Sequence, residues 1–271
     1  MSIHEPTGIH WIEHGSGPAI VVLHGFQVDH RLVHRFVESV FEVRPGFRRI
    51  YVDLPAHGKS SGHHITSTDD VVGRISAFID DLMGTEPYAL VGSSFGGGIA
   101  RALTSLAPSR ILGMALIAPM IIADSDRRAL PEHQVLEADD VFLATIESGA
   151  ARADFEEIAV RHNRQTWELF ASDVLPGALL GDHDAIGRIA ASYEFSTRPE
   201  GRFETYDRPV AFILGRQDSV VGYADAFSLA NSYPHATFAV LDGAGHNVHH
   251  EQPELVAQVL GEWADRVLAA M

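Results

Sequence analysis

The sequence predicts an α/β protein: a mostly parallel, doubly wound β-sheet with helices on both faces and an inserted helical cap. Three observations indicate this class. Short apolar runs alternate with helical patterns along most of the 271 residues. Several of those runs are apolar at every position, as strands buried on both faces require. About ninety residues between roughly 118 and 209 break the alternation, and their apolar residues recur at helical spacing.

The first part of the chain supplies five predicted strands. The run Ile9 to His14 ends in the turn Gly15-Ser16-Gly17, and the continuous apolar run Ala19 to Leu23 follows it. Ser67 to Asp70 has the pattern of a capping box, so a helix is expected to begin there. In chain order the strands are predicted at 9–14, 19–23, 49–53, 88–91 and 111–117, and the helices at 31–42, after 67–70 and from Ser94.

The last part of the chain returns to the alternation. Pro209 to Leu214 and Thr237 to Leu241 are predicted as two further buried strands. Pro253 is expected in the first turn of a final helix, where a backbone N–H is not needed. Apolar residues then recur along one stripe as far as Leu268, which is typical of a helix that packs against a sheet.

A G-x-S-x-G pentapeptide, Gly92 to Gly96, joins the predicted strand 88–91 to the helix that follows it. In this context the motif forms a sharp turn that exposes the hydroxyl of its serine. Serine is a weak nucleophile at neutral pH, so it needs a neighbouring base and donors for the oxyanion. The flanking glycines let the turn take backbone angles that other residues avoid. The pattern therefore predicts Ser94 as a nucleophile.

An acid and then a histidine are expected after later strands of such a sheet. Asp218 follows the strand 209–214, and His246 follows the strand 237–241. We predict that His246 takes the proton of Ser94 and returns it to the leaving group. Asp218 would hold the imidazole in the required tautomer and stabilise its charged form.

Other acids and histidines fit these roles less well. Asp242 is too close in sequence to reach behind His246, and Asp124 follows a different strand, so both rank below Asp218. His24 and His57 are expected to organise loops through hydrogen bonds, because one general base already has the required context.

Two backbone N–H groups are predicted to form an oxyanion hole. In this architecture one donor follows the nucleophile, and the other belongs to the loop after the early strand 19–23. These positions are Phe95 and Phe26.

The motifs together resemble the α/β-hydrolase superfamily, from about residue 8 to the C-terminus. Ala56 stands where that superfamily often has glycine, a departure for which we expect little consequence. The motifs that carry the resemblance are His24-Gly25, D-L-P-x-H-G-x-S from Asp53 to Ser60, the turn at Ser94, G-R-x-D from Gly215 to Asp218, and G-x-G-H from Gly243 to His246.

The resemblance implies a core of residues 1–118 and 207–271, with a helical cap of residues 119–206 over Ser94. A long loop without secondary structure is improbable in a compact domain, which also favours helices there. Aromatic residues of the cap would then line a pocket for the acyl or alcohol part of a substrate, although for any single residue packing within the cap itself is the more common role. Both roles stay open for the large side chains of Trp167, Phe142 and Tyr193.

Composition sets further limits. The chain has 36 acidic and 20 basic residues, a formal charge of −16, which argues against nucleic acid and anionic membranes as partners. It has no cysteine, so a thiol nucleophile and disulfides are excluded. We expect no cofactor and no catalytic metal, because the sixteen histidines include no H-E-x-x-H motif. A cytoplasmic monomer or homodimer that acts on a small molecule is expected, since no leader or membrane-spanning run is recognised.

The predicted function is hydrolysis of a small, largely apolar carboxylic ester, thioester or lactone through an acyl-enzyme. Alternatives are hydrolysis of carbon–carbon bonds, as in the meta-cleavage-product hydrolases, cofactor-free perhydrolase or haloperoxidase-like activity, and a non-catalytic ligand-binding protein. Ser93 and Asn247 depart from the meta-cleavage-product hydrolases, which usually have asparagine and an aromatic residue there. Serine at position 94 argues against a dehalogenase or epoxide hydrolase, which would carry aspartate.

Overall fold

The computed structural model describes residues 2–4 and 6–271, and it contains one eight-stranded sheet in the order β1-β2-β4-β3-β5-β6-β9-β10. β1 and β2 pair antiparallel at one edge, as do β2 and β4, and the remaining pairs are parallel. The strands are β1 (Ser2–His4), β2 (Ile9–His14), β3 (Ala19–Leu23), β4 (Arg48–Val52), β5 (Tyr88–Ser93), β6 (Ile111–Ile117), β9 (Val210–Gly215) and β10 (Ala236–Leu241).

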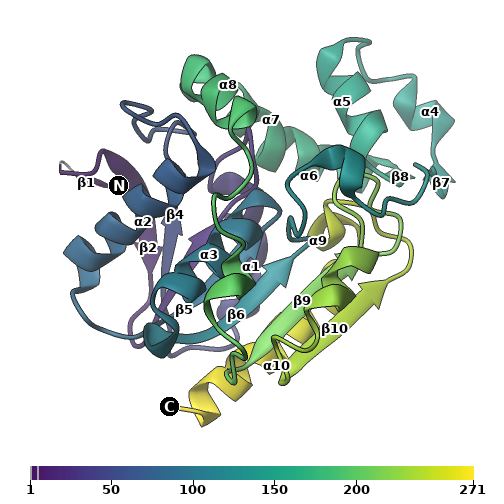
Figure 1. Cartoon of the computed structure of the whole chain (residues 1–271). Helices are drawn as coiled ribbons and strands as arrows, with labels where there is room; N and C mark the ends of the chain where they lie inside the picture. Colours follow the sequence, from purple (N-terminus) through teal and green to yellow (C-terminus); the bar gives the residue numbers. More distant parts are fainter. Residues whose placement is uncertain (1, 5) are drawn as a thin grey trace.

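Long helices cover both faces of the sheet. α3 (Phe95–Leu106) lies in front of it in Figure 1 and contacts α2 (Thr68–Met83), whereas α10 (Pro253–Ala269) lies behind it and contacts α1 (Arg31–Phe41). The Ser67 hydroxyl caps α2 by accepting the N–H of Asp70. This arrangement confirms the predicted doubly wound sheet.

The core strands match the predicted runs to within about two residues, because they are buried on both sides. β3, β5, β6 and β9 are buried at every position. β1 was not predicted; its three residues offer no apolar run, and it pairs only with β2 at the edge of the sheet.

Most of the chain between β6 and β9 lies beyond the ends of the strand arrows in Figure 1, and its last part, after α8, runs back alongside α3 to the start of β9. We propose that residues 119–206 form the cap domain over a core of residues 1–118 and 207–271. This insertion contains α4 (Asp140–Leu143), α5 (Ala150–Ile158), α6 (Arg164–Leu169), a π-helical turn (Phe170–Val174), α7 (Leu175–Ala178), α8 (His183–Ala191), 3₁₀ turns at Ser125–Arg127 and Pro199–Arg202, and the parallel pair β7 (Glu137–Ala138) and β8 (Arg161–His162).

The helices of this insertion are shorter than predicted. The sequence predicts one helical face through Val135, Asp139, Phe142 and Ile146, but α4 spans only four residues. The reason is local: the Asp139 carboxylate accepts the N–H of Phe142 and caps the helix there, while the chain before it forms β7. Among the described residues, no helix is long and apolar enough to cross a membrane.

Candidate active site

Ser94 lies in the turn between β5 and α3, with φ 51° and ψ −115°. A positive φ is unfavourable for a residue with a Cβ, by about 1–3 kcal/mol, and persists only where the surroundings enforce it. Here the surroundings are backbone: a Cβ on Gly92 would come within 2.5 Å of Gly96 O, and a Cβ on Gly96 within 2.4 Å of Leu23 O. The glycines of the motif therefore let α3 lie close enough to the strands to hold this turn.

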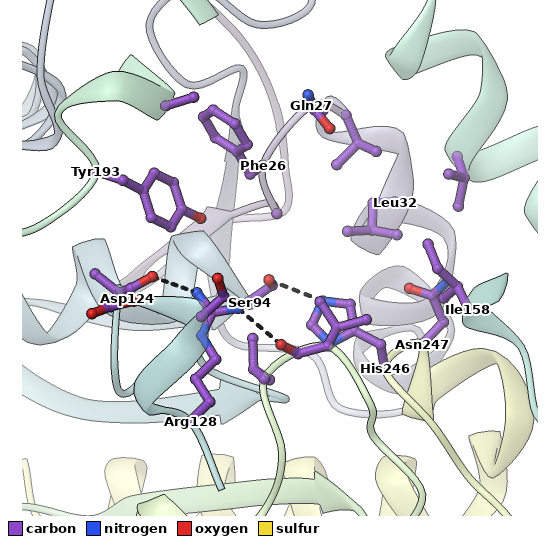
Figure 2. Close-up of a pocket in the computed structure, with 18 of the residues that line it drawn as sticks. Phe26, Gln27, Leu32, Ser94, Asp124, Arg128, Ile158, Tyr193, His246 and Asn247 are labelled. Atoms are coloured by element: carbon purple, nitrogen blue, oxygen red, sulfur yellow. Dashed lines mark hydrogen bonds between the residues drawn. The ribbon is translucent and has the colours of Figure 1, made fainter. Parts of the chain in front are cut away.

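The structure brings the three predicted side chains together. The Ser94 hydroxyl donates to His246 Nε2 at 3.0 Å, and His246 Nδ1 donates to Asp218 Oδ2 at 3.0 Å (Figure 2 shows the first of these bonds). Asp218 is fully buried, and its other oxygen accepts the N–H groups of Val220 and Val221. Because Asp218 accepts from Nδ1, the imidazole presents Nε2 as the acceptor for the serine proton.

The alternative acids lie elsewhere. Asp242 is exposed and accepts the side-chain amide of Gln217 at 2.8 Å. Asp124 is half-buried and accepts the N–H of Asp126, where it caps a 3₁₀ turn. In the described part of the chain, neither carboxylate forms a hydrogen bond with His246.

The two predicted oxyanion donors lie beside the serine turn. Phe95 is the first residue of α3, where a backbone N–H has no acceptor within the helix. The N–H of Phe26 donates to no backbone carbonyl among residues 2–4 and 6–271. The rings of Phe26 and Phe95 meet edge to face with centroids 5.2 Å apart, and Tyr193 packs against both.

The loop that carries His246 is held by polar contacts that the sequence analysis missed. Gln217 Oε1 accepts the N–H groups of Gly243 and Ala244. The buried Glu251 carboxylate accepts three backbone N–H groups: Gly245 next to His246 on one oxygen, and Val160 and Arg161 of the insertion on the other. Burial raises the pKa of Glu251. The only signal in the sequence is that Glu251 follows His246 by five residues.

His24 and His57 act as loop-organising groups, as predicted. His24 is buried; its Nδ1 donates to Gly25 O, and its Nε2 accepts the N–H of Leu54. His57 Nδ1 donates to Pro55 O. Burial lowers the pKa of His24 and lowers that of His57 to about 3, so both rings are neutral at ordinary pH.

A carboxylate between two histidines is the one cluster with metal-ligand composition among the described residues. His10 Nδ1 donates to Asp53 Oδ2 at 2.7 Å, and His30 Nδ1 donates to Oδ1 at 2.6 Å. Asp53 also accepts the backbone N–H groups of His30 and Lys59. Four donors use the lone pairs of this carboxylate, so the cluster fits a hydrogen-bond junction better than a metal site.

A cavity of about 700 Å³ opens above Ser94 and His246. Phe26 and Asn247 line it, and so does Tyr193 of the insertion (Figure 2).

Trp167 and Phe142, the other two large side chains named in the sequence analysis, lie elsewhere. Trp167 packs on Phe155 and Phe170 inside the insertion, and Arg164 lies over the ring of the buried Phe142, so neither lines the cavity. Of the two roles open for these side chains, Trp167 and Phe142 therefore take packing within the insertion, and Tyr193 takes the lining of the cavity. Arg128, which the sequence analysis did not single out, does line the cavity.

Comparison with known proteins shows which family and which relatives this chain resembles. The model of the alpha/beta hydrolase fold family matches residues 18–253. A pimeloyl-[acyl-carrier protein] methyl ester esterase of Xanthomonas campestris is 29% identical, over 91% of this chain and 94% of the esterase. The dihydrolipoyllysine-residue acetyltransferase component of the acetoin cleaving system of Cupriavidus necator is 26% identical over 86% of this chain, which spans only 59% of that relative. The crystal structure of an alpha/beta superfamily hydrolase from Oenococcus oeni superposes with a TM-score of 0.90 and 28% identity, over 97% of each chain.

Proposed function

The chain belongs to the α/β-hydrolase fold family, and we propose that it is a serine hydrolase that cleaves a small carboxylic ester, thioester or lactone through an acyl-enzyme on Ser94. The observation that carries the proposal is the continuous chain of hydrogen bonds from Ser94 to His246 to Asp218 at the floor of an open cavity. The esterase from Xanthomonas, similar over nearly its whole length, supports ester chemistry.

In the first half of the reaction, the Ser94 oxygen attacks the carbonyl carbon of the substrate while His246 Nε2 takes the serine proton. Asp218 stabilises the resulting imidazolium. The C–O bond to the alcohol then breaks, and His246 returns the proton to the departing oxygen. This leaves the acyl group on Ser94.

In the second half, a water molecule attacks the acyl-enzyme as His246 takes one of its protons. The C–O bond to Ser94 breaks, and the serine recovers its proton from the imidazolium. Both steps pass through a tetrahedral oxyanion, for which the N–H groups of Phe26 and Phe95 are the proposed donors.

A serine-directed fluorophosphonate tests the nucleophile. We expect it to label the wild-type protein at Ser94 and to leave Ser94→Ala unlabelled. That variant should lose about three to six orders of magnitude in kcat against 4-nitrophenyl esters while it stays folded. Ser93→Ala is the matched control, since Ser93 is the adjacent buried hydroxyl and should retain labelling at Ser94. Labelling at Ser93, or full activity in Ser94→Ala, would contradict the proposal.

A further inference from the structure

The cavity above Ser94 has two chemically different walls. Leu32, Ile158 and Asn247 line it on the side of His246, whereas Tyr193 and Arg128 line it on the opposite side of Ser94 (Figure 2). A substrate that fills the cavity would therefore meet mostly apolar atoms in one direction and hydrogen-bond donors in the other.

Arg128 brings a positive charge to this second wall without a carboxylate to balance it. Its Nε donates to Ile122 O at 2.8 Å, one terminal nitrogen to Val220 O at 2.8 Å and the other to Ala123 O at 2.7 Å. All three acceptors are uncharged carbonyl oxygens. A guanidinium has five N–H donors, so one remains on each terminal nitrogen.

Two buried arginines, in contrast, each have a carboxylate partner. Arg101 donates to both oxygens of Glu200, and Arg49 to both oxygens of Glu38. Among the described residues, no carboxylate lies within ion-pair distance of Arg128. A half-buried guanidinium with spare donors that faces a cavity is suited to bind an anion that the protein itself does not supply.

The Tyr193 hydroxyl adds a second donor on the same wall. Its ring is fixed by stacking on Phe95, with an interplanar angle of 17°, and by edge contact with Phe26. No hydrogen-bond partner for the hydroxyl occurs within the described part of the chain. Burial raises the pKa of Tyr193, and the charge of Arg128 acts in the opposite direction, so the phenol keeps its proton and can donate it.

Two carboxylates also line the cavity, and neither neutralises Arg128. Glu194 is exposed and faces Arg127 at 3.8 Å. Asp124 accepts the N–H of Asp126. Asp124 is close enough to the cavity to repel an anion, so its removal provides a test with the opposite sign.

We propose that Arg128 and the Tyr193 hydroxyl bind a carboxylate at the far end of the acyl chain, so that the substrate is a half-ester of an aliphatic dicarboxylic acid. The acyl side follows from the proposed function, on which this inference rests. Because His246 gives its proton to the leaving oxygen, the alcohol departs on the His246 side, and the acyl chain extends toward Arg128. Hydrolysis then releases the alcohol and a dicarboxylate.

The test compares two esters with the same five-carbon acyl chain, 4-nitrophenyl hydrogen glutarate and 4-nitrophenyl pentanoate. The wild type should have the higher kcat/KM for the glutarate half-ester. In Arg128→Gln the ratio of the two kcat/KM values should fall about tenfold to a hundredfold, mainly through KM, because a hydrogen bond to a charged group is lost. In Asp124→Asn the ratio should rise. Arg74→Gln is the matched control, since Arg74 also donates to backbone carbonyl oxygens, of Thr7 and His63, and does not line this cavity.

Equal losses for both esters in Arg128→Gln would overturn the inference and assign Arg128 a purely structural role between its three carbonyl partners. A wild-type preference for the pentanoate ester would overturn it as well. Calorimetric titration of glutaramate and pentanamide, which differ only in the far carboxylate, separates this result from failure of the proposed function, because it needs no turnover. Glutaramate should bind the wild type more tightly than pentanamide does, even if Ser94 proves not to be the nucleophile. If Arg128→Gln fails to fold, Asp124→Asn and this titration still decide the matter.

Discussion

The serine turn and the inserted segment above it are held in different ways. Every residue of β5 and β6 is buried, and α3 between them is buried along ten of its twelve residues. In α5 of the insertion only Phe155 is buried. Close packing of β5, β6 and α3 holds the turn of Ser94 in place beneath the cavity, whereas most of the insertion faces solvent.

Polar contacts tie the insertion to the core at many points, the buried ion pair of Arg101 with Glu200 and the bond from Arg128 to Val220 O among them. Glu251 binds Val160 and Arg161, the Ala56 carbonyl accepts the N–H of Asp182, and the Thr68 hydroxyl donates to Tyr193 O. This contrast indicates that substitutions in the core should alter the rate of the chemical step, and that substitutions in the insertion should alter stability or substrate choice.

The largest expected effect concerns the buried acid of the core. Asp218→Asn should lower kcat by about four orders of magnitude with little loss of stability, because the neutral amide no longer selects the required imidazole tautomer. Asp242→Asn is the control and should change kcat only slightly, since Asp242 is exposed and bonded to Gln217. Steady-state kinetics with a 4-nitrophenyl ester would measure both. If Asp242→Asn loses most of its kcat and Asp218→Asn keeps it, Asp242 and not Asp218 is the acid that acts on His246.

The aromatic interior of the insertion should affect stability rather than specificity. Trp167→Ala removes a half-buried ring from the cluster with Phe155 and Phe170, and should lower the free energy of unfolding by about 2–4 kcal/mol. The order of preference along a series of acyl chain lengths should stay unchanged. Tyr193→Ala, in contrast, opens the cavity and should shift that order, with discrimination changed by about 1–3 kcal/mol. A shifted preference in Trp167→Ala would break the distinction between interior and lining residues.

Glu251 forms hydrogen bonds with the loop of His246 in the core and with the insertion, so its removal should affect both kcat and stability. Glu251→Ala leaves three backbone N–H groups without an acceptor and should reduce stability by about 1–3 kcal/mol. It should also lower kcat about tenfold or more by loosening the loop of His246, and Glu251→Gln should recover part of that loss. Glu156→Ala is the control on the surface of the insertion, where an ion pair with Arg152 is worth little. If kcat is unchanged in Glu251→Ala, the contact is structural only.

Acid should destabilise the core through its neutral histidines. Burial lowers the pKa of His57 to about 3 and of His249 to about 4, below the ordinary value of 6.5. The unfolded chain then binds more protons than the folded one below pH 6.5, so stability falls as the pH drops from 6.5 toward 4. Each such histidine contributes up to about 1.4 kcal/mol per pH unit. Urea unfolding at several pH values would measure the slope, and His57→Gln should reduce it. An unchanged slope in that variant would show that His57 is not a source.

Much of the core could be predicted from the sequence, because continuous apolar runs such as Ala19 to Leu23 fit only buried strands. The proximity of Ser94, Asp218 and His246 could be anticipated as well, since each follows a strand of one parallel sheet. The roles of Arg128 and Glu251 could not. Each binds a backbone group far away in the chain, Arg128 the carbonyl of Val220 and Glu251 the N–H of Val160, and such contacts leave no pattern in the sequence. The short helix at Asp140 was missed because a capping side chain overrode the periodicity.

The position of the insertion also affects the order in which the protein folds. β9 pairs with β6 across the whole inserted segment, about ninety residues later in the chain, and β9 and β10 supply the loops of Asp218 and His246. Closure entropy grows only with the logarithm of loop length, so this gap costs roughly 2 kcal/mol more than a short connection. Because Asp218 and His246 follow the insertion in the chain, the ribosome must synthesise the β9–β10 region before Ser94 acquires its base. Until then the nascent chain presents an inactive serine. The same slow growth in closure entropy allows the insertion to lengthen or shorten with little effect on the sheet beneath it.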